Sequence, residues 1–384
     1  MDNSFPEMKK FLGFGCMRLP LKDGKVNIEE TKAMVDLFLE KGFNYFDTAH
    51  PYLNGLSELA VRECLTSRYP REKYLLADKL TEPYFQKEED IRPFFENQLK
   101  WCGVNYFDFY LMHAQGAENY DKFQRCHAYE TAFALKREGK IRHVGLSFHD
   151  KPEMLERILT DHPDVEFVQI QFNYIDYDNL SVESRRVYEV CRKFHKPVIV
   201  MEPVKGGSLV RLPEKAQAAL DALNAKRGRK MSNASYAIRF AAGFEGIRMV
   251  LSGMSNLKQM QDNLSYMQNF QPLDAEEKAA IDQVVKVFRG LDVIPCTSCH
   301  YCIEENHCPK GILIPDIFAA YNSKKAFHNW NADFYYNSVL THGHGKASDC
   351  VRCGGCEKVC PQHLPIRNLL KDAAAEFEKE EKEK

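Results

Sequence analysis

Four side chains suited to proton transfer lie at or just beyond the ends of three consecutive apolar segments. Asp47 and Tyr52 are five positions apart after one segment, Lys79 ends the next, and His113 ends the one after that. An ammonium group beside a phenol favours the ionised phenol, so Lys79, paired with Asp47, is expected to lower the pKa of Tyr52. Tyr52 would then donate a proton to a forming oxyanion, and His113 would orient the reacting oxygen.

A second group of residues with chemical potential is a set of cysteines near the end of the chain. Eight of the 13 cysteines form two runs that each end before a proline: Cys296, Cys299, Cys302 and Cys308, then Cys350, Cys353, Cys356 and Cys360. In two-cluster ferredoxins, three closely spaced cysteines bind one [4Fe-4S] cluster and the fourth reaches the other cluster. By this crossed pattern Cys296, Cys299 and Cys302 share one cluster with Cys360, and Cys350, Cys353 and Cys356 share the other with Cys308.

Structural zinc is the alternative for these cysteines, since four-cysteine zinc sites use two pairs at the same short spacing. Zinc explains neither the third cysteine of each run nor the proline after each fourth cysteine. The gap before Cys308 is five residues where three is usual, which leaves the position of Cys308 less defined.

The elements that position the first group alternate regularly along the chain. Apolar segments that predict strands cover 11–16, 43–47, 74–79, 107–112, 142–146, 167–171, 197–201 and 248–252, with helical patterns between them. Eight alternating strand and helix units predict an α/β fold, a (β/α)8 TIM barrel of parallel strands. An open doubly wound sheet is the alternative, but no G-x-G-x-x-G motif follows an early strand.

In such a barrel the catalytic groups lie where the strands end, at the carboxyl face. Asp47, Lys79 and His113 end the second, third and fourth predicted strands, so their side chains are expected to converge with Tyr52. The simpler interpretation is that Asp47 caps a turn and Tyr52 is a half-buried aromatic residue. That interpretation requires all four residues to be placed together by coincidence.

Composition and charge divide the chain and exclude some classes of protein. We expect a barrel over 1–290, a small ferredoxin-like iron–sulfur domain over 291–375, and a charged tail over 376–384. The net charge of −2 gives no case for binding to nucleic acid or a membrane surface. No apolar run approaches the roughly 18 residues of a membrane span, and the first residues do not resemble a signal peptide, so we expect a cytoplasmic protein.

The run Phe46-Asp47-Thr48-Ala49-His50-Pro51-Tyr52, with Lys79 and His113, resembles the aldo-keto reductase family. The resemblance implies that Tyr52 is the general acid and that Asp47, Lys79 and His113 support it. It also implies a nicotinamide cofactor, usually NADPH, extended across the barrel mouth.

The resemblance extends to the positions that bind the cofactor in this family. It implies cofactor contacts by Gly15, Cys16, Ser147, Gln169, Met201, Gly253, Met254, Ser255, Gln259 and Asn263. Met201 stands where a tyrosine commonly stacks on the nicotinamide, and Phe148 replaces a usual asparagine. Gln259 stands where NADPH-preferring members often have arginine, so either NADPH or NADH is expected.

The segments 13–20 and 201–207 are similar to a subgroup of this family with a C-terminal ferredoxin-type domain. The expected function is therefore NAD(P)H-dependent reduction of a small carbonyl substrate, coupled to or accompanied by iron–sulfur electron transfer. The alternative is a docking protein, in which the barrel is a scaffold and two [4Fe-4S] clusters pass electrons to a partner protein. Hydride transfer moves two electrons and a cluster moves one, so the two hypotheses assign different roles to the barrel.

Overall fold

The structure is a computed structural model that describes residues 4–82, 84–179, 182–290, 294, 296, 301–304, 308–327, 330–360 and 364–378. Its main feature is a closed barrel of eight parallel strands, which confirms the predicted TIM barrel. In barrel order the strands are β1 (Leu12–Gly15), β4 (Tyr45–Asp47), β5 (Leu75–Leu80), β6 (Phe107–Gln115), β7 (Ile141–Phe148), β8 (Phe167–Gln171), β9 (Val198–Met201) and β10 (Ile247–Gly253). Because β10 pairs with β1, the open-sheet alternative is wrong.

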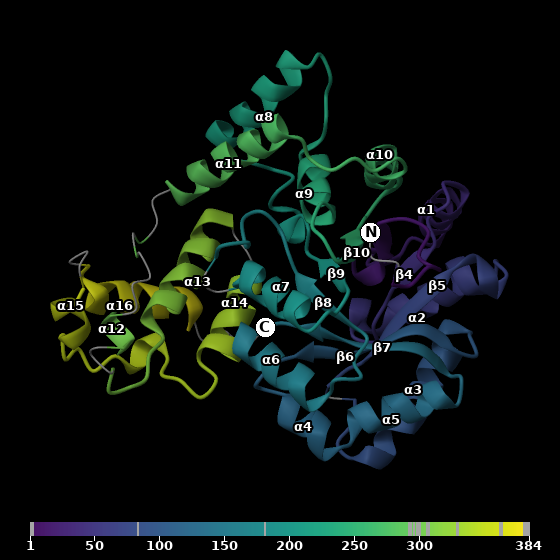
Figure 1. Cartoon of the computed structure of the whole chain (residues 1–384), viewed down its shortest axis with the longest axis horizontal. Coiled ribbons are helices and arrows are strands. Elements are labelled where there is room, and N and C mark those ends of the chain that lie inside the picture. The colour runs from purple at the N-terminus through teal and green to yellow at the C-terminus, as the bar shows by residue number, and fades with distance from the viewer. Residues whose placement is uncertain are drawn as a thin grey trace.

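Helices surround this barrel, as Figure 1 shows. Those beside the barrel are α1 (Ile28–Glu40), α2 (Leu56–Val61), α3 (Glu88–Cys102), α4 (Tyr120–Arg125), α5 (Ala128–Arg137), α6 (Pro152–Asp161), α7 (Ser184–Lys193), α9 (Asn233–Ala242) and α10 (Leu257–Met267). Two more helices, α8 (Glu214–Lys226) and α11 (Ala275–Arg289), pack against each other and project away from the barrel in Figure 1. A two-stranded hairpin of β2 (Leu21–Lys22) and β3 (Lys25–Val26) was not predicted. Within the described residues, no helix combines the length and apolar character needed to cross a membrane.

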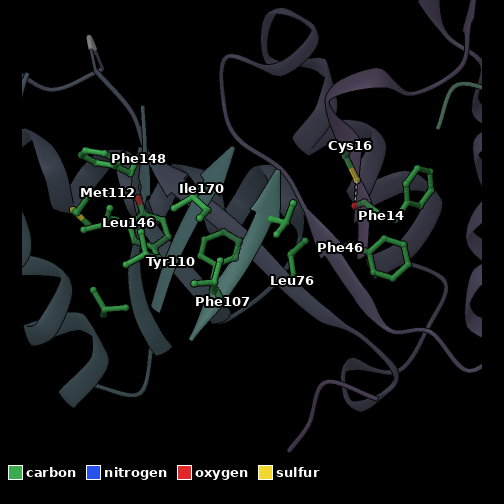
Figure 2. Close-up of a cluster of buried hydrophobic side chains, with 14 of the residues drawn as sticks. Phe14, Cys16, Phe46, Leu76, Phe107, Tyr110, Met112, Leu146, Phe148 and Ile170 are labelled. Carbon is green, nitrogen blue, oxygen red and sulfur yellow. Dashed lines mark hydrogen bonds between the residues drawn. The ribbon is translucent and has the colours of Figure 1, made fainter. Parts of the chain in front are cut away.

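The alternation of side chains along each strand determines which residues reach the barrel interior. One face of the strands shares a buried apolar cluster with the surrounding helices. Figure 2 shows part of this cluster, including Phe14, Phe46, Leu76, Leu146 and Ile170. The other face fills the barrel interior with Tyr45, Ala77, Phe109, Leu111, Phe167, Ile199, Met249 and Leu251, joined by Phe5 and Met8 from the N-terminal segment. Asp47, Lys79 and His113 come two residues after members of this interior layer, so alternation directs them to the mouth.

A separate apolar core holds the C-terminal segment together. Its helices are α12 (Tyr301–Glu304), α13 (Ile314–Phe327), α14 (Trp330–Phe334), α15 (Gly355–Lys358) and α16 (Ile366–Phe377), with a π-helical turn over Tyr335–Leu340. The core contains Ile312, Ile317, Phe318, Ile366 and Leu370, together with Cys302 and Cys356. We call this segment, from 294 to 378, the cysteine module.

The end of α16 is packed against the cysteine module. Phe377 stacks on Tyr336 with ring centroids 4.4 Å apart, and Glu376 forms an ion pair with Lys325 at 2.6 Å. These two residues, which the sequence analysis placed in the charged tail, therefore belong to the last turn of this helix.

The cysteine module contacts the barrel at the carboxyl ends of β7, β8 and β9. Lys151, after β7, forms an ion pair with Asp316 of α13 at 2.6 Å. The ring of Phe334 lies 5.8 Å from that of His149, and Asn331 donates hydrogen bonds to Gln171 and Glu202. Figure 1 shows α13 and α14 between the barrel and the other module helices.

Candidate active site

Lys79 is the centre of the candidate site. Its ammonium group is fully buried and donates to Asp47 Oδ1 and to the backbone oxygen of Thr48, each at 2.7 Å. It also lies 4.8 Å from the ring centroid of Tyr52. Two of its three N–H donors are therefore held by Asp47 and Thr48, and the charge lies beside the phenol ring of Tyr52.

Tyr52 follows β4 at the start of a 3₁₀ turn, Tyr52–Gly55, in which Leu53 and Asn54 take left-handed conformations. Burial raises the pKa of Tyr52 to about 12, although Lys79 pulls this pKa downward. The predicted lowering of the Tyr52 pKa is therefore wrong in its net direction, because burial outweighs the neighbouring charge. Tyr52 keeps its proton at neutral pH and stays available as a donor.

The charges around Tyr52 are set by burial and by the ion pair. Burial disfavours the charged form of Lys79, but Asp47 and Tyr52 outweigh this effect and its pKa is raised above the usual value. Burial also raises the pKa of Asp47, against the pull of Lys79. Since each ion supports the charged form of the other, the pair is strongly coupled.

His113 lies beside Tyr52, with ring centroids 6.0 Å apart. Its Nδ1 is 2.6 Å from the hydroxyl of Thr81. Burial lowers the pKa of His113 well below its usual value, and Lys79 and His149 add to this effect. The imidazole is therefore neutral at physiological pH. The structure thus brings Asp47, Tyr52, Lys79 and His113 together as the sequence predicted.

Several supporting residues were not identified from the sequence. Thr81 could have been found, because it lies two positions after Lys79, directly beyond the end of β5, where the alternation of the strand continued by one residue places it on the same side as Lys79. Gln98 of α3 donates to the backbone oxygen of Lys79 at 3.0 Å and to Glu58 at 3.2 Å. Glu58 in turn is 2.6 Å from His50, in the same loop as Tyr52. These contacts join different elements, so no local sequence pattern signals them.

Three predicted cofactor residues lie at or beyond the midpoint of neighbouring strands. Ser147 on β7 and Gln169 on β8 are partners in the strand register, and Gln169 Nε2 lies 3.7 Å from the sulfur of Met201 on β9. Gln169 Oε1 is buried and has no hydrogen-bond partner among the described residues. A buried acceptor without a partner suits an amide donor such as the carboxamide of a nicotinamide, so these residues fit that group. Phe148, in contrast, is buried in the apolar core.

The remaining predicted cofactor residues lie at β1 and β10. Gly15 pairs with both Gly253 and Asp47 in the strand register. Gly253, Ser255 and Gln259 are exposed, and Gln259 Oε1 accepts from the backbone N–H of Ser255 at 2.8 Å. Cys16, Met254 and Asn263 are buried, and Asn263 bonds to Ser252 and Tyr266. These three residues therefore contact the surrounding protein and not the surface of the mouth.

The cysteines of the second run lie close together. Burial raises the pKa of Cys356 to about 11, and the adjacent Cys350, Glu357 and Cys353 add to this effect. Cys302 and Cys356 are buried, Cys353 is exposed, and α12 lies against α15. Cys296, Cys308 and Cys360 border the same apolar core, whereas Cys299 lies outside the described residues. The described cysteines of this module are free thiols, and free thiols gathered in one place fit thiolate ligation of an iron–sulfur centre.

An eight-stranded parallel barrel with a Tyr–Lys–Asp–His group at its carboxyl face, joined to a cysteine module, defines a class of barrel oxidoreductase. Residues 11–286 match the model of the aldo/keto reductase family, and the chain belongs to this family. Residues 295–364 match the model of the 4Fe-4S dicluster domain. The chain is thus an oxidoreductase with a C-terminal iron–sulfur domain, as the sequence predicted.

Known proteins similar to this chain support the family assignment. A soybean (Glycine max) protein named "Probable aldo-keto reductase 1" is 29% identical over 213 residues, which cover 51% of this chain and 56% of the relative. L-galactose dehydrogenase of Arabidopsis thaliana is 23% identical, with coverage of 73% and 92%.

Solved structures show the same fold. The holo form of an aldo-keto reductase from Bacillus halodurans has a TM-score of 0.58 at 24% identity and covers 72% of this chain and 92% of its own. An aldo-keto reductase from Klebsiella pneumoniae in complex with NADPH has a TM-score of 0.58 at 20% identity, with coverage of 72% and 95%.

Proposed function

We propose that the chain reduces a small carbonyl substrate with NADPH or NADH, that Tyr52 donates the proton, and that the cysteine module carries two [4Fe-4S] clusters. The observation that carries the proposal is the buried Lys79 ammonium group, which joins Asp47 to Tyr52 beside a neutral His113. The catalytic unit of the chain would be 1–290, and the cluster unit would begin at 291 and include the end of α16, with the charged tail after it.

Some side chains at the barrel mouth would bind the cofactor, and others would transfer the proton. A bound nicotinamide supplies the hydride, and Ser147 and Gln169 would hold its carboxamide while Met201 packs on the ring. If Thr81 donates to His113 Nδ1, the imidazole proton is on Nε2 and can hold the carbonyl oxygen. Tyr52 would transfer its hydroxyl proton to that oxygen, and Lys79 would stabilise the phenolate that remains.

The adenosine end of the cofactor would lie near the loop between β10 and α10. Gly253, Ser255 and Gln259 are exposed there, beside the first turn of α10. The N–H groups of a helix N-terminus favour phosphate groups. The protein beneath this loop would be formed by Gly15, Cys16, Met254 and Asn263, which support the exposed residues.

The test of this proposal is an anaerobic assay of the holoprotein with small aldehydes and ketones, following the consumption of NADPH and then NADH. Consumption that depends on both the carbonyl compound and Tyr52 supports the proposal. If no carbonyl compound accelerates the consumption of either cofactor, the barrel does not perform this reaction.

The cluster assignment keeps the crossed pattern of the sequence. Cys296, Cys299, Cys302 and Cys360 would hold one cluster, and Cys350, Cys353, Cys356 and Cys308 the other. Such clusters supply one-electron transfer. An anaerobically purified sample is expected to contain about eight iron atoms per chain. Stoichiometric zinc without iron would remove this assignment.

Electron transfer to a partner protein is the second candidate function. Cys353 and Val351 are exposed in the second cysteine run, which favours contact between that run and another protein. Anaerobic titration of the holoprotein with NADPH tests whether the two units exchange electrons. Bleaching of the cluster absorbance without added flavin would connect them, and unchanged absorbance would assign the clusters to a separate donor or to a structural role.

A further inference from the structure

One side chain of the cysteine module joins two strand ends of the barrel. Asn331, on α14, is buried, and its Nδ2 donates to Gln171 Oε1 at 3.1 Å and to Glu202 Oε1 at 2.6 Å. Gln171 is the last residue of β8, and Glu202 directly follows Met201, the last residue of β9. Since Gln171 and Met201 are partners in the strand register, Asn331 bridges two adjacent strand ends.

The same two strands carry two of the proposed nicotinamide contacts. Gln169 lies two positions before Gln171, so both side chains are on the same face of β8. Met201 adjoins Glu202, and its sulfur lies 3.7 Å from Gln169 Nε2. The residues that Asn331 contacts, Gln171 and Glu202, are therefore direct neighbours of Gln169 and Met201 along the two strands.

The barrel holds the other side of this bridge rigidly. Asp176 accepts hydrogen bonds from Gln171 and Asn173, each at 2.7 Å, and forms a fully buried ion pair with Lys205 at 2.5 Å. Asn173 also donates to the backbone oxygen of Glu202 at 3.2 Å. These barrel contacts hold Gln171 and the backbone of Glu202 in place. A hydrogen bond from Asn331, on the module side, can therefore set the orientation of the two side chains.

Glu202 depends strongly on its contact with Asn331. Its backbone has a φ of 54°, a left-handed conformation that a residue other than glycine rarely takes and that surrounding contacts must hold in place. Its Oε2 is buried and has no hydrogen-bond partner among the described residues, so Asn331 supplies a hydrogen bond to the other oxygen only. Without Asn331, the buried carboxyl would have to move or find another partner.

We propose that Asn331 is a positioning residue for the cofactor: it orients Gln171 and Glu202, and through them Gln169 and Met201, so that nicotinamide affinity depends on the cysteine module. The inference rests on the proposed function, because it takes Gln169 and Met201 as cofactor contacts. It gives the module a role in the barrel that does not require electron exchange between the two units.

The test measures NADPH binding to holoprotein variants by anaerobic calorimetry. Asn331→Ala is expected to raise the Kd of NADPH by about tenfold, within the range of 5- to 150-fold that coupled sites show. Once NADPH saturates the variant, kcat should change little, which separates a loss of cofactor positioning from a general loss of structure. The matched control is Asn337→Ala, because exposed Asn337 donates only to the backbone oxygen of Asp333 in the same segment.

A second variant tests the inference from the barrel side. Glu202→Ala should also raise the Kd, and the double variant with Asn331→Ala should raise it by less than the two single effects combined, because the contact between Asn331 and Glu202 is lost in both single variants. Wild-type affinity in Asn331→Ala, or additive effects in the double variant, would overturn the inference. A wild-type protein that binds neither NADPH nor NADH would overturn the proposed function itself, and this inference with it.

Discussion

The two sides of the barrel mouth are each built around a buried lysine–aspartate ion pair, but they use it differently. On one side Lys79 pairs with Asp47 at 2.7 Å, and the remaining contacts of the ammonium group come from the barrel. On the other side Lys205 pairs with Asp176 at 2.5 Å, and the network around Asp176 extends through Gln171 to the cysteine module.

The two ion pairs therefore have different roles: one supports proton donation, and the other supports the contact between the barrel and the cysteine module. The Lys79 side directs a charge at Tyr52, so it can support proton donation without the cysteine module. The Lys205 side anchors a strained loop, in which Glu202 and Lys205 both take left-handed conformations, and presents it to Asn331. The same ionic unit thus supports a reacting group in one place and a contact between domains in the other.

The largest expected effect is on the Lys79 side. Tyr52→Phe removes the proposed proton donor and is expected to lower kcat/KM for carbonyl reduction by about 10²- to 10⁴-fold. Cluster absorbance should stay unchanged, because Tyr52 lies in the barrel. Steady-state kinetics with the exposed Tyr84→Phe as control measures this effect, and unchanged turnover in Tyr52→Phe would remove the proton-donor assignment.

The two ion pairs can be compared directly by removing each lysine. Lys79→Met and Lys205→Met each leave an unpaired buried carboxylate, so each is expected to lower the free energy of unfolding by about 3–5 kcal/mol. Only Lys79→Met should also alter proton donation at saturating cofactor. Urea denaturation measures the stability, with Lys226→Met as control because its pair with Glu276 is exposed. Equal kinetic defects in both variants would contradict the division of roles.

The pH dependence of stability tests the electrostatics of the Lys205 side. Burial raises the pKa of Glu202 to about 7, although Lys205 and Asn331 pull it down. A carboxyl with a raised pKa binds its proton more tightly in the folded state, so its stabilising effect is lost as pH rises. Relative to Glu202→Gln, the wild type should lose about 3 kcal/mol between about pH 4.5 and pH 7.5. Urea denaturation of the wild type and Glu202→Gln at several pH values measures this difference. If the two stability profiles are parallel, the pKa of Glu202 is not raised by burial.

The smallest expected effect is at the edge of the contact between barrel and module. Lys151→Ala removes a part-buried ion pair, in which the side chains of Lys151 and Asp316 are 22% and 11% exposed, and is expected to lower the free energy of unfolding by about 1–2 kcal/mol. The Kd of NADPH should be unchanged, because Lys151 does not contact Gln171 or Glu202 in the network described above. A Kd that rises as much as in Asn331→Ala would show that the whole contact matters, and not Asn331 in particular.

The barrel and its reactive residues could be predicted because both depend on local patterns. The bounds of β8 match the predicted segment 167–171, since the apolar pattern of the strand is strong there. Asp47, Lys79 and His113 follow from the rule that parallel strands end together at one face. The direction of the Tyr52 pKa did not follow, because burial is a property of the assembled site and outweighs the charge of Lys79.

The cysteine module was harder to predict beyond its cysteines. In α13 the buried residues include Asp316, Ile317, Phe318, Ala320 and Ser323, which lie on several sides of the helix. A helix packed on several sides lacks the single apolar stripe that reveals amphipathic helices, so periodicity missed it. Asn331 lies between the two cysteine runs with no motif around it, and only the folded arrangement shows that it reaches the barrel.

The position of α14 between the two cysteine runs has a consequence for biosynthesis. The last barrel strand ends at Gly253, whereas the helix that completes the rim begins at Trp330, and the last helix of the module, α16, which packs against α13, ends at Phe377. Because domains generally fold as units in the order of synthesis, we expect the barrel to close on the ribosome while one side of its mouth is still open. The nascent chain would therefore pass through a stage with a complete proton-transfer group and an incomplete rim.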